Sequence, residues 1–587
     1  MREHFERIEK LKQEMIREGV DLYIVPTSDY NLSEYTPEYF KEREYLSGFT
    51  GSAGTLIVTQ YEARLFTDGR YFIQAEKELK DSGVILMKIG EKNVPRIEDY
   101  VYRQLEKGFT IGYDGRTMRY GFGKSLRETV KDKDITFKTD IDLVGKIWED
   151  RPDFPNGTTW VLPYKYSGED AEFKLKRLRE EMVNEGVDGV LVSSLDDVCW
   201  LYNVRGEDIE YTPVTLAFSI VTDTKATFYI NEEKISKDVK KYLELNNVII
   251  RPYENVYDDA MSFPGTLLVD PDKTNETLTL SVKDKKLLMN PVAKLKCIKN
   301  DTEIENIKDA HLKDGVALTK TIYWLKKLQE SSEIFRETEL SVSEHLLKER
   351  EKQKNFVMPS FEAIVASGDH SAIVHYSPNE KSNRIIDTGM LLIDSGGHYL
   401  EGTTDVTRTV SIKEPDAEMK RYYTAVLKGH LDLGMATFDE NSPTFDLDRI
   451  ARKPLSDKQQ GYNHGTGHGV GYLLSVHEDP VGFRKSGLDA KDYPFKRHMV
   501  VSNEPGIYLE GKFGIRIENL MYVRGLAKRL RFDTLTLVPY DKASINIKEL
   551  TFEELEELRW YSEKVYTRIS PYLTDEEKMW LREETVF

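Results

Sequence analysis

The sequence predicts an α/β protein with two related α/β domains in tandem, followed by a larger mixed α/β domain whose sheet is largely antiparallel. Three observations support this prediction. A helix-then-strand pattern near the N-terminus recurs 167 residues further along the chain. A segment beginning near residue 301 has apolar residues at every third or fourth position, which is typical of a helix. After residue 360, short strand-like runs predominate, and helical segments separate some of them.

The repeat predicts the architecture of the N-terminal half. In each copy an amphipathic helix ends at a glycine, a favourable residue just beyond the end of a helix, and a short apolar strand follows. Three positions of the first copy match three of the second: Met15, Gly19 and Asp21 correspond to Met182, Gly186 and Asp188. The period exceeds the roughly 20 to 50 residues of solenoid repeats, so it indicates two related domains.

Changes in composition predict the domain boundaries. The stretch 151–168 contains proline and glycine and separates the two copies of the repeat. The second copy ends near residues 290–300, directly before the long helical pattern. We therefore predict a first α/β domain at residues 1–160, a second at 161–300, and the mixed α/β domain at 301–587.

Charge and cysteine content restrict the classes of function. Among 587 residues, 83 Lys and Arg oppose 101 Asp and Glu, which gives a net charge of −18. Nucleic acids and anionic membranes attract an excess of positive charge, so neither is expected as a partner. No apolar run approaches the ~20 residues of a membrane span, and the charged N-terminus lacks the apolar core of a signal peptide. The two cysteines, Cys199 and Cys297, cannot form a disulfide framework, which favours a reducing cytoplasm.

Histidines are unevenly distributed. Ten of the 11 lie between His311 and His498, so we expect the chemistry in the third domain. The first motif there contains two aspartates, Asp394 and Asp405, on two strand-like runs joined by a glycine-containing turn. A hairpin can place such carboxylates side by side, where they repel each other unless a cation lies between them. The ordinary alternative is that each aspartate forms a turn at a strand end.

The second motif contains two histidines four residues apart. His464 and His468 belong to HGTGHGVG, which has the histidine spacing of a zinc-binding HExxH helix but lacks its glutamate. The glycines disfavour a helix, whereas an extended segment with this even spacing places both histidines on one face. A nucleotide-binding loop is a second alternative, but no GK[ST] sequence follows. The pattern therefore favours close backbone packing around a histidine site.

Two further motifs contribute glutamates. Glu504, in SNEPGIY, lies at a strand end before a Pro-Gly turn. In GIRIEN, strand alternation places Arg516 and Glu518 on one face, where a simple ion pair is the ordinary alternative. An oxygen-rich set of four carboxylates and one imidazole suits two divalent ions such as Mn²⁺ better than one structural zinc ion. The members of this predicted metal site are Asp394, Asp405, His468, Glu504 and Glu518.

With these motifs, the third domain resembles the pita-bread metallopeptidases, which include methionine aminopeptidase, prolidase and aminopeptidase P. The whole chain resembles the long, three-domain form of aminopeptidase P (Xaa-Pro aminopeptidase), through FTDGRYFIQA, WLYNVRGEDIEYTPV and the C-terminal WLREET. The resemblance implies two creatinase-type N-terminal domains and a pita-bread catalytic domain. It also implies a homodimer and two divalent metal ions, with manganese expected, held by the five residues above.

The resemblance implies roles for further residues. His375 and His477 correspond to histidines that line the active site and hold the substrate carbonyl or the tetrahedral intermediate. Without the resemblance, the residue pattern favours structural strand histidines with satisfied hydrogen bonds. His464 corresponds to a position near the pocket for proline. Arg70, in DGRYF, corresponds to an arginine that reaches toward the substrate. In a dimer, this arginine can reach a substrate that is bound to the other subunit.

The function that the resemblance implies is hydrolysis of the bond between an N-terminal residue and a following proline. A hydroxide activated by the two metal ions attacks the carbonyl of the first residue, while one ion and His375 or His477 stabilise the oxyanion. Glu504 carries a proton from the water to the proline nitrogen, and Arg516 orients Glu504 or Glu518.

Two alternatives remain. A prolidase would cleave only Xaa-Pro dipeptides, but prolidases resemble a two-domain version of this architecture, and the duplicated N-terminal half favours the longer form. A non-catalytic pita-bread peptide-binding protein would have lost metal ligands, whereas this sequence has all five. We therefore expect a cytoplasmic, homodimeric aminopeptidase that acts on peptides with proline in the second position.

Overall fold

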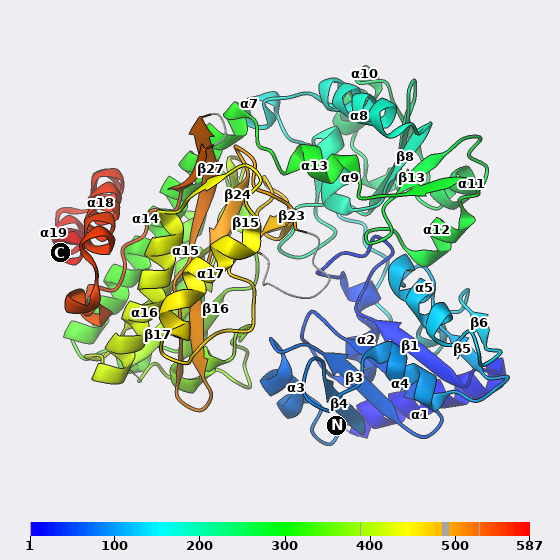
Figure 1. The fold of residues 1–587 in the computed structure, drawn as a ribbon, viewed down its shortest axis with the longest axis horizontal. Helices are drawn as coiled ribbons and strands as arrows, with labels where there is room; N and C mark the ends of the chain where they lie inside the picture. The colour runs from blue at the N-terminus through cyan, green and yellow to red at the C-terminus, as the bar shows by residue number, and fades with distance from the viewer. Residues whose placement is uncertain (1, 388, 484–491, 527–528) are drawn as a thin grey trace. The chain divides into compact units, whose positions relative to one another are not determined.

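The computed structural model of the chain describes residues 2–387, 389–483, 492–526 and 529–587. The chain forms two compact units, coloured from blue to red along the sequence in Figure 1. The first unit comprises Met1–Leu162 and Glu169–Leu295, and the second comprises Pro163–Gly168 and Lys296–Phe587.

The first unit begins with a six-stranded sheet. Its strands are β1 (Leu22–Pro26), β2 (Thr55–Thr59), β3 (Ala63–Thr67), β4 (Val84–Lys88), β5 (Thr110–Gly112) and β6 (Thr136–Lys138). Their order is β4-β3-β2-β1-β5-β6. The helices are α1 (Arg2–Glu18), α2 (Glu42–Ser47), α3 (Phe72–Glu78), α4 (Ile97–Gln104), α5 (Tyr120–Thr129) and α6 (Leu143–Ile147).

Helices cover both faces of this sheet. Leu22 and Ile24 of β1 pack with α4 and α5, whereas Tyr23 and Val25 pack with α1, α2 and α6. Successive side chains of a strand point to opposite faces, so a strand buried on both faces needs a continuous apolar run. The LYIV segment meets this requirement.

A second six-stranded sheet follows in the same unit. Its strands are β8 (Gly189–Val192), β10 (Ala217–Thr222), β11 (Ala226–Ile230), β12 (Val248–Arg251), β13 (Leu267–Val269) and β14 (Lys285–Leu287). The order is β12-β11-β10-β8-β13-β14. The helices are α8 (Ala171–Glu185), α9 (Leu195–Tyr202), α10 (Lys237–Leu245), α11 (Asn255–Met261), α12 (Glu276–Ser281) and α13 (Pro291–Lys296). β7 (Thr159–Val161) pairs separately with β9 (Val204–Gly206).

The two sheets have the same topology. In each, the first strand pairs antiparallel with the second and parallel with the fifth, and both outer pairs are parallel. The matched helices also end in the same way, because Gly19 and Gly186 have positive φ angles of 64° and 63°. Glycine has no Cβ and adopts this conformation without strain. The predicted repeat therefore extends to the strand order and to the ends of the helices.

The second unit contains the antiparallel sheets. Its helices are α7 (Tyr164–Ser167), α14 (Asp301–Glu330), α15 (Glu339–Glu351), α16 (Ala417–Gly434), α17 (Thr444–Ser456), α18 (Phe552–Ile569) and α19 (Asp575–Thr585). The strands of its smaller sheets are β15 (Phe356–Pro359), β16 (Ile364–Ser367), β17 (Met390–Ser395), β18 (Gly397–Tyr399), β19 (Gly402–Thr403), β20 (Val406–Ser411), β25 (Gly506–Leu509) and β26 (Phe513–Arg516). The large sheet has the order β21-β28-β27-β24-β22-β23. Its strands are β21 (Thr437–Asp439), β22 (His468–Gly469), β23 (Glu478–Gly482), β24 (Val500–Asn503), β27 (Asn519–Leu526) and β28 (Arg529–Thr534).

Helices α14 and α16 pack on the sheet that carries the predicted aspartates (Figure 1). Leu391 and Ile393 of β17 and Val410 of β20 share one core with Ile322 of α14 and Val426 of α16. Every strand pairing of this unit in the described residues is antiparallel. The predicted mixed α/β domain with a largely antiparallel sheet is therefore confirmed.

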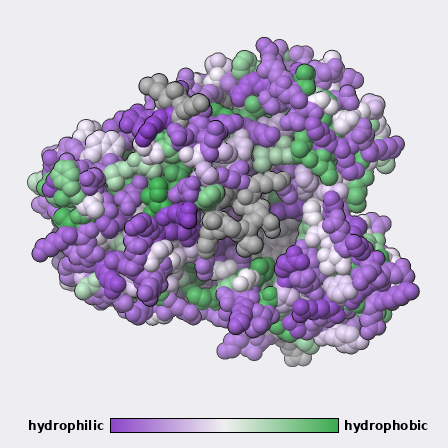
Figure 2. Space-filling view, viewed as in Figure 1, coloured by the Kyte–Doolittle hydropathy of each residue, from purple (hydrophilic) through white to green (hydrophobic). Residues whose placement is uncertain are grey.

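Hydrophilic side chains predominate on the face shown in Figure 2, where hydrophobic residues form small separate groups. None of the helices in the described part of the chain has the length and hydrophobicity that a bilayer span requires.

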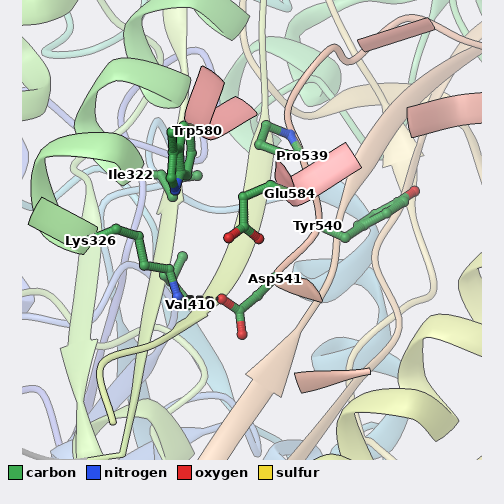
Figure 3. A pocket seen from close by; sticks show the side chains of 8 residues that line it. All are labelled: Ile322, Lys326, Val410, Pro539, Tyr540, Asp541, Trp580 and Glu584. Atoms are coloured by element: carbon green, nitrogen blue, oxygen red, sulfur yellow. Dashed lines mark hydrogen bonds and ion pairs between the residues drawn. The ribbon is translucent and has the colours of Figure 1, made fainter. Parts of the chain in front are cut away.

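A small cavity in the second unit lies between α14, β20 and the C-terminal segment (Figure 3). Its volume of about 10 Å³ is close to the minimum for one water molecule. Lys326 donates a hydrogen bond to Asp541 at its wall, at 2.7 Å. The cavity is too small for a peptide, so the site of chemistry must lie elsewhere.

Candidate metal centre

Two neighbouring strands position the predicted aspartates. Asp394 lies near the end of β17, directly opposite Thr407 of β20, and Asp405 immediately precedes β20. Both side chains are buried. The connection is longer than the single turn expected, because the chain between them forms β18 and β19, which pair with each other in a separate sheet. The predicted pairing of the two aspartate-bearing runs is nevertheless present.

The glycine-rich histidine motif lies against the large sheet. His468 begins β22, whose neighbours are β23 and β24, and the preceding residues form a loop. A Cβ atom on Gly467 would clash with the carbonyl oxygen of Ser502, and one on Gly469 with that of Glu478. These glycines therefore allow backbones to approach each other closely. The predicted close backbone packing is therefore present around His468.

The two glutamates lie at adjacent strand ends. Glu504 directly follows β24, and its amide donates to the carbonyl oxygen of Thr466 at 2.9 Å. Glu518 lies between β26 and β27, and β27 pairs with β24 through Asn503 and Asn519. Sheet pairing thus brings both carboxylates to the edge that carries His468.

All five predicted ligands meet in one place. His468 Nε2 lies 3.5 Å from Asp405 Oδ2 and 3.4 Å from Glu504 Oε1. Asp405, His468 and Glu518 each offer one ligand atom within 4.8 Å of the others. Asp394 lies opposite Thr407 in the strand pair, and the Thr407 hydroxyl donates to Glu518, so Asp394 lies next to this group.

In three of the predicted ligands, a hydrogen bond to another group of the protein fixes one polar atom of the side chain. Arg516 Nη2 donates to Asp394 Oδ2 at 2.6 Å, and Thr407 Oγ1 donates to Glu518 Oε2 at 2.8 Å. His468 Nδ1 lies 2.9 Å from the carbonyl oxygen of its neighbour Gly469. A carbonyl only accepts, so Nδ1 carries the hydrogen and Nε2 presents a lone pair toward the carboxylates.

The remaining atoms indicate that cations fit this site. Asp394 Oδ1, Asp405 Oδ1 and Glu518 Oε1 are buried without a hydrogen-bond partner in the described structure. Leaving a buried carboxylate oxygen unpaired is unfavourable unless an ion or water compensates for it. Hydrogen bonds to the outer atoms with open inner atoms are also typical of metal ligands. The residues present therefore fit divalent cations.

The pKa values support the same conclusion. Burial, followed by the charge of Asp394, raises the pKa of Asp405 well above its usual value. Burial and the charge of Asp405 do the same for the pKa of Glu518, and burial raises the pKa of Glu504. Four carboxylates this close cannot all be ionised without a compensating positive charge.

Arg516 has a different partner from the one expected. Its guanidinium donates directly to Asp394 and reaches Glu518 only through Thr407, whose hydroxyl lies 3.2 Å from Arg516 Nε. The predicted role of Arg516, to orient Glu504 or Glu518, stays a prediction, and the path through Thr407 is compatible with it for Glu518. Arg516 meets Asp394 because β17 packs beside β26.

Tyr508 extends this network toward the glycine-rich loop. Arg516 Nη1 donates to the Tyr508 hydroxyl at 2.7 Å, and that hydroxyl lies 2.8 Å from His464 Nε2. Neither Tyr508 nor Thr407 was predicted. Thr407 had a recognisable signal, because it lies two residues after Asp405 and so shares its side of the strand. The sequence gives no comparable signal for Tyr508, apart from its position in the SNEPGIY motif.

The other predicted residues differ in how closely they approach the carboxylates. The His477 ring centroid lies 4.3 Å from that of His468, and His464 Nδ1 lies 3.9 Å from Glu504 Oε2. His375 is half-buried in a turn after the short 3₁₀ segment Gly368–Ala372, and its approach to substrate stays a prediction. Arg70 belongs to the first unit, where it forms a bidentate pair with Asp68 at 2.8 and 2.9 Å. Its role also stays a prediction.

Family models match almost the whole chain. The creatinase/prolidase N-terminal domain matches residues 7–144 and 150–303. Metallopeptidase family M24 matches residues 305–525, and the C-terminal region of peptidase M24 matches 528–586. The expected creatinase-type domains followed by a pita-bread domain are therefore confirmed.

Individual relatives match at full length. Xaa-Pro aminopeptidase 1 of Dictyostelium discoideum is 37% identical over 605 residues, which cover 98% of this chain and 96% of that protein. Aminopeptidase P2 of Arabidopsis thaliana is 35% identical, with 96% and 85% covered. Among solved structures, the X-prolyl aminopeptidase of Caenorhabditis elegans, described as a cytosolic enzyme with a di-nuclear active site, has a TM-score of 0.95 at 32% identity, and 99% of each chain is covered. This chain belongs to the Xaa-Pro aminopeptidases of metallopeptidase family M24.

Proposed function

We propose that this chain is a metal-dependent aminopeptidase that hydrolyses the bond between an N-terminal residue and a following proline. The observation that carries this proposal is the set of three buried carboxylate oxygens, on Asp394, Asp405 and Glu518, that have no hydrogen-bond partner in the described residues. Asp405 and Glu518 also share one possible metal-binding group with His468. Proteins named Xaa-Pro aminopeptidase that align over nearly the whole chain support the same reaction.

The ligands that we propose for two divalent cations, with Mn²⁺ the expected metal, are Asp394, Asp405, His468, Glu504 and Glu518. Oxygen-rich sites with one imidazole suit Mn²⁺ better than the thiolate-rich sites typical of structural zinc. The di-nuclear active site described for the nematode enzyme supports two ions rather than one. When bound, such a pair supplies a water molecule of lowered pKa and polarises a substrate carbonyl.

Glu504 is the group that we propose to move the proton. Its carboxylate lies 3.4 Å from His468 Nε2, beside the other proposed ligands, where a general base that later acts as an acid is needed. The hydroxyl of Ser502 donates to Glu504 Oε1 at 3.1 Å and fixes that oxygen. Glu504 then accepts a proton from the attacking water and delivers it to the proline nitrogen.

Other side chains bind and orient. His477 and His375 donate to the carbonyl oxygen where negative charge develops, a contribution that is large when donors are held in advance. His464 contacts the substrate proline, and Arg70 contacts the peptide. Arg516 holds Asp394 and contributes to catalysis only through the ligands.

The location, the assembly and the domain limits are part of the same proposal. We place the enzyme in the cytoplasm, in line with the cytosolic description of the nematode protein. A homodimer follows from the family resemblance alone. The proposed domains are residues 1–160, 161–300 and 301–587. The family-model limits at 303 and 305 support the second boundary, whereas the match to the second domain begins at residue 150, before the first boundary.

The test compares three peptides that share one N-terminal residue: a tripeptide with proline second, the matched tripeptide with alanine second, and the Xaa-Pro dipeptide. We expect release of the first residue from the proline tripeptide and much slower release from the alanine peptide. Cleavage of the dipeptide alone would indicate a prolidase, and equal cleavage of both tripeptides would contradict proline recognition.

A further inference from the structure

The loop that carries His464 and His468 needs support from outside itself. Glycines occupy positions 461, 465, 467 and 469, so the backbone has few intrinsic restraints. Packing restrains Gly467 and Gly469, but a Cβ atom on Gly465 would meet nothing closer than 3.8 Å in the described residues. The first half of the loop, next to His464, is therefore not fixed by close backbone contact.

Arg452 of α17 supplies the restraint that the glycines lack. Its Nη1 donates to the carbonyl oxygen of Tyr462 and its Nη2 to that of His464, both at 2.8 Å. The guanidinium carbon lies 3.9 Å from the centre of the Tyr462 ring. One planar guanidinium thus binds two carbonyl oxygens and one aromatic face of the loop, an arrangement that lysine cannot reproduce.

Asp448, one helical turn earlier, fixes the centre of the loop. Its Oδ2 accepts from Arg452 Nε at 2.7 Å, and its Oδ1 accepts from the hydroxyl of Thr466. The Tyr462 hydroxyl lies 2.6 Å from the same Thr466 oxygen and donates to it. Asp448 is 2% exposed and Thr466 is fully buried, so these hydrogen bonds do not compete with water.

This network reaches the metal centre on both sides of Thr466. Thr466 lies between His464 and His468, and its carbonyl oxygen accepts from the amide of Glu504. The same helix offers a contrast in Arg449, which pairs with Asp446 at 3.3 Å and is 71% exposed. Exposed ion pairs of this kind contribute little to stability, and in the described residues no hydrogen bond joins either side chain of this pair to the loop that carries His464.

We propose that Arg452 and Asp448 are positioning residues that hold the loop 462–468 in the conformation in which His464 meets substrate and His468 meets metal. The effect that we expect on peptide cleavage rests on the proposed function. Its consequence for Mn²⁺ affinity does not depend on which peptide the enzyme cleaves.

The first experiment compares Arg452→Met with the matched control Arg449→Met on the same helix. Chelator-stripped proteins are titrated with Mn²⁺ by calorimetry, at a temperature where circular dichroism shows each to be folded. Positioning contacts of this type are typically worth about 10- to 100-fold in metal affinity or activity. We expect Arg452→Met to weaken Mn²⁺ binding and raise KM for a proline tripeptide by about tenfold or more, and Arg449→Met to match the wild type.

A second pair isolates the hydroxyl of Thr466. Thr466→Val removes the donor to Asp448 with little change in shape, whereas Thr466→Ser retains it. We expect the valine variant to lose Mn²⁺ affinity and the serine variant to recover most of it. Wild-type affinity and KM in both Arg452→Met and Thr466→Val would overturn the proposal, as would equal losses in Arg449→Met. Failure of the wild type to cleave a proline tripeptide would instead refute the proposed function, and the metal titration would still test the positioning.

Discussion

Asp208 in the first unit and Asp405 in the second are both buried aspartates, but their surroundings differ. Asp208 Oδ1 accepts from the amide of Gly157 at 2.9 Å, and Oδ2 pairs with Lys234 at 2.6 Å, with both side chains completely buried. Asp405 Oδ1 is equally buried but has no hydrogen-bond partner in the described residues, and its nearest charged neighbours include other carboxylates.

The difference indicates where each site obtains its compensating charge. A buried charge is tolerated only when a counter-charge or hydrogen bonds offset the loss of hydration. The chain itself supplies Lys234 to Asp208. At the candidate metal centre Arg516 is paired with Asp394, whereas Asp405 and Glu504 have the His468 imidazole as their neighbour, at 3.5 and 3.4 Å. The candidate site therefore fits bound cations as the source of the remaining positive charge. The polar partners of a buried carboxylate, rather than its burial, separate a structural role from metal binding.

The largest effect is expected from a substitution of Asp405, because only this one of the two compared aspartates is proposed to bind metal. Asp405→Asn should lower Mn²⁺ binding and peptide hydrolysis by at least about 100-fold, because the carboxylate of one proposed ligand is lost. The same change should leave the metal-free protein at least as stable as the wild type, since it removes one of several mutually repelling groups. Metal content, turnover and thermal melting in chelator measure the three quantities. Wild-type turnover by this variant would refute the assignment of Asp405 as a ligand.

The second largest effect should appear at the other site. Asp208→Asn leaves the Lys234 ammonium buried without its counter-charge, so we expect the free energy of unfolding to fall by about 3–5 kcal/mol. Urea denaturation measures this loss, while activity per folded molecule should stay unchanged. The double variant Asp208→Asn with Lys234→Met should recover part of the stability. An unchanged free energy of unfolding in Asp208→Asn would show that the Asp208–Lys234 pair does not stabilise the first unit.

Substitution of Arg516 measures how much the metal centre depends on the hydrogen bonds that this arginine donates to Asp394 and Tyr508. Arg516→Met removes the hydrogen bond to Asp394 and the contact with Tyr508, so we expect Mn²⁺ affinity and kcat/KM to fall by about 10- to 100-fold. Tyr508→Phe keeps the pair with Asp394 and should have a smaller effect on metal affinity. Equal losses of metal affinity in the two variants would contradict this order of importance.

A buried histidine outside the metal centre sharpens the comparison. His311 Nε2 on α14 also lacks a hydrogen-bond partner in the described part of the chain, and burial lowers the pKa of this ring to about 4. An unfolded histidine has a pKa of about 6.5, so between these values the unfolded state binds a proton that the folded state does not. Stability should therefore fall as the pH drops through this window, by about 2 kcal/mol at pH 5. The pH dependence of urea unfolding, compared with His311→Gln, measures this contribution, which the glutamine variant should lack.

Sequence patterns predicted the parts of this molecule that depend on local order. The apolar LYIV and GVLV runs and the helix-ending glycines predicted the two matching α/β sheets. The ligand positions were predicted because each lies in a short motif of chemically distinctive residues. Contacts between distant segments were not predictable in this way.

The missed contacts have a common physical cause. Arg516 meets Asp394 although they are 122 residues apart, because strand packing and not sequence spacing brings them together. Asp448 and Arg452 lie on a helix whose pattern is that of any partly buried amphipathic segment. Only the fold shows that their shared face is turned toward the loop of His464.

The most direct test of metal-dependent catalysis is the number of Mn²⁺ ions bound per chain by chelator-stripped wild type and by Asp405→Asn, measured by calorimetric titration. We predict two ions for the wild type and loss of this binding in the variant, accompanied by recovery of proline-peptide cleavage only in the wild type. Wild-type protein that binds no Mn²⁺, or that cleaves the peptide undiminished in excess chelator, would contradict a catalytic metal centre at these residues.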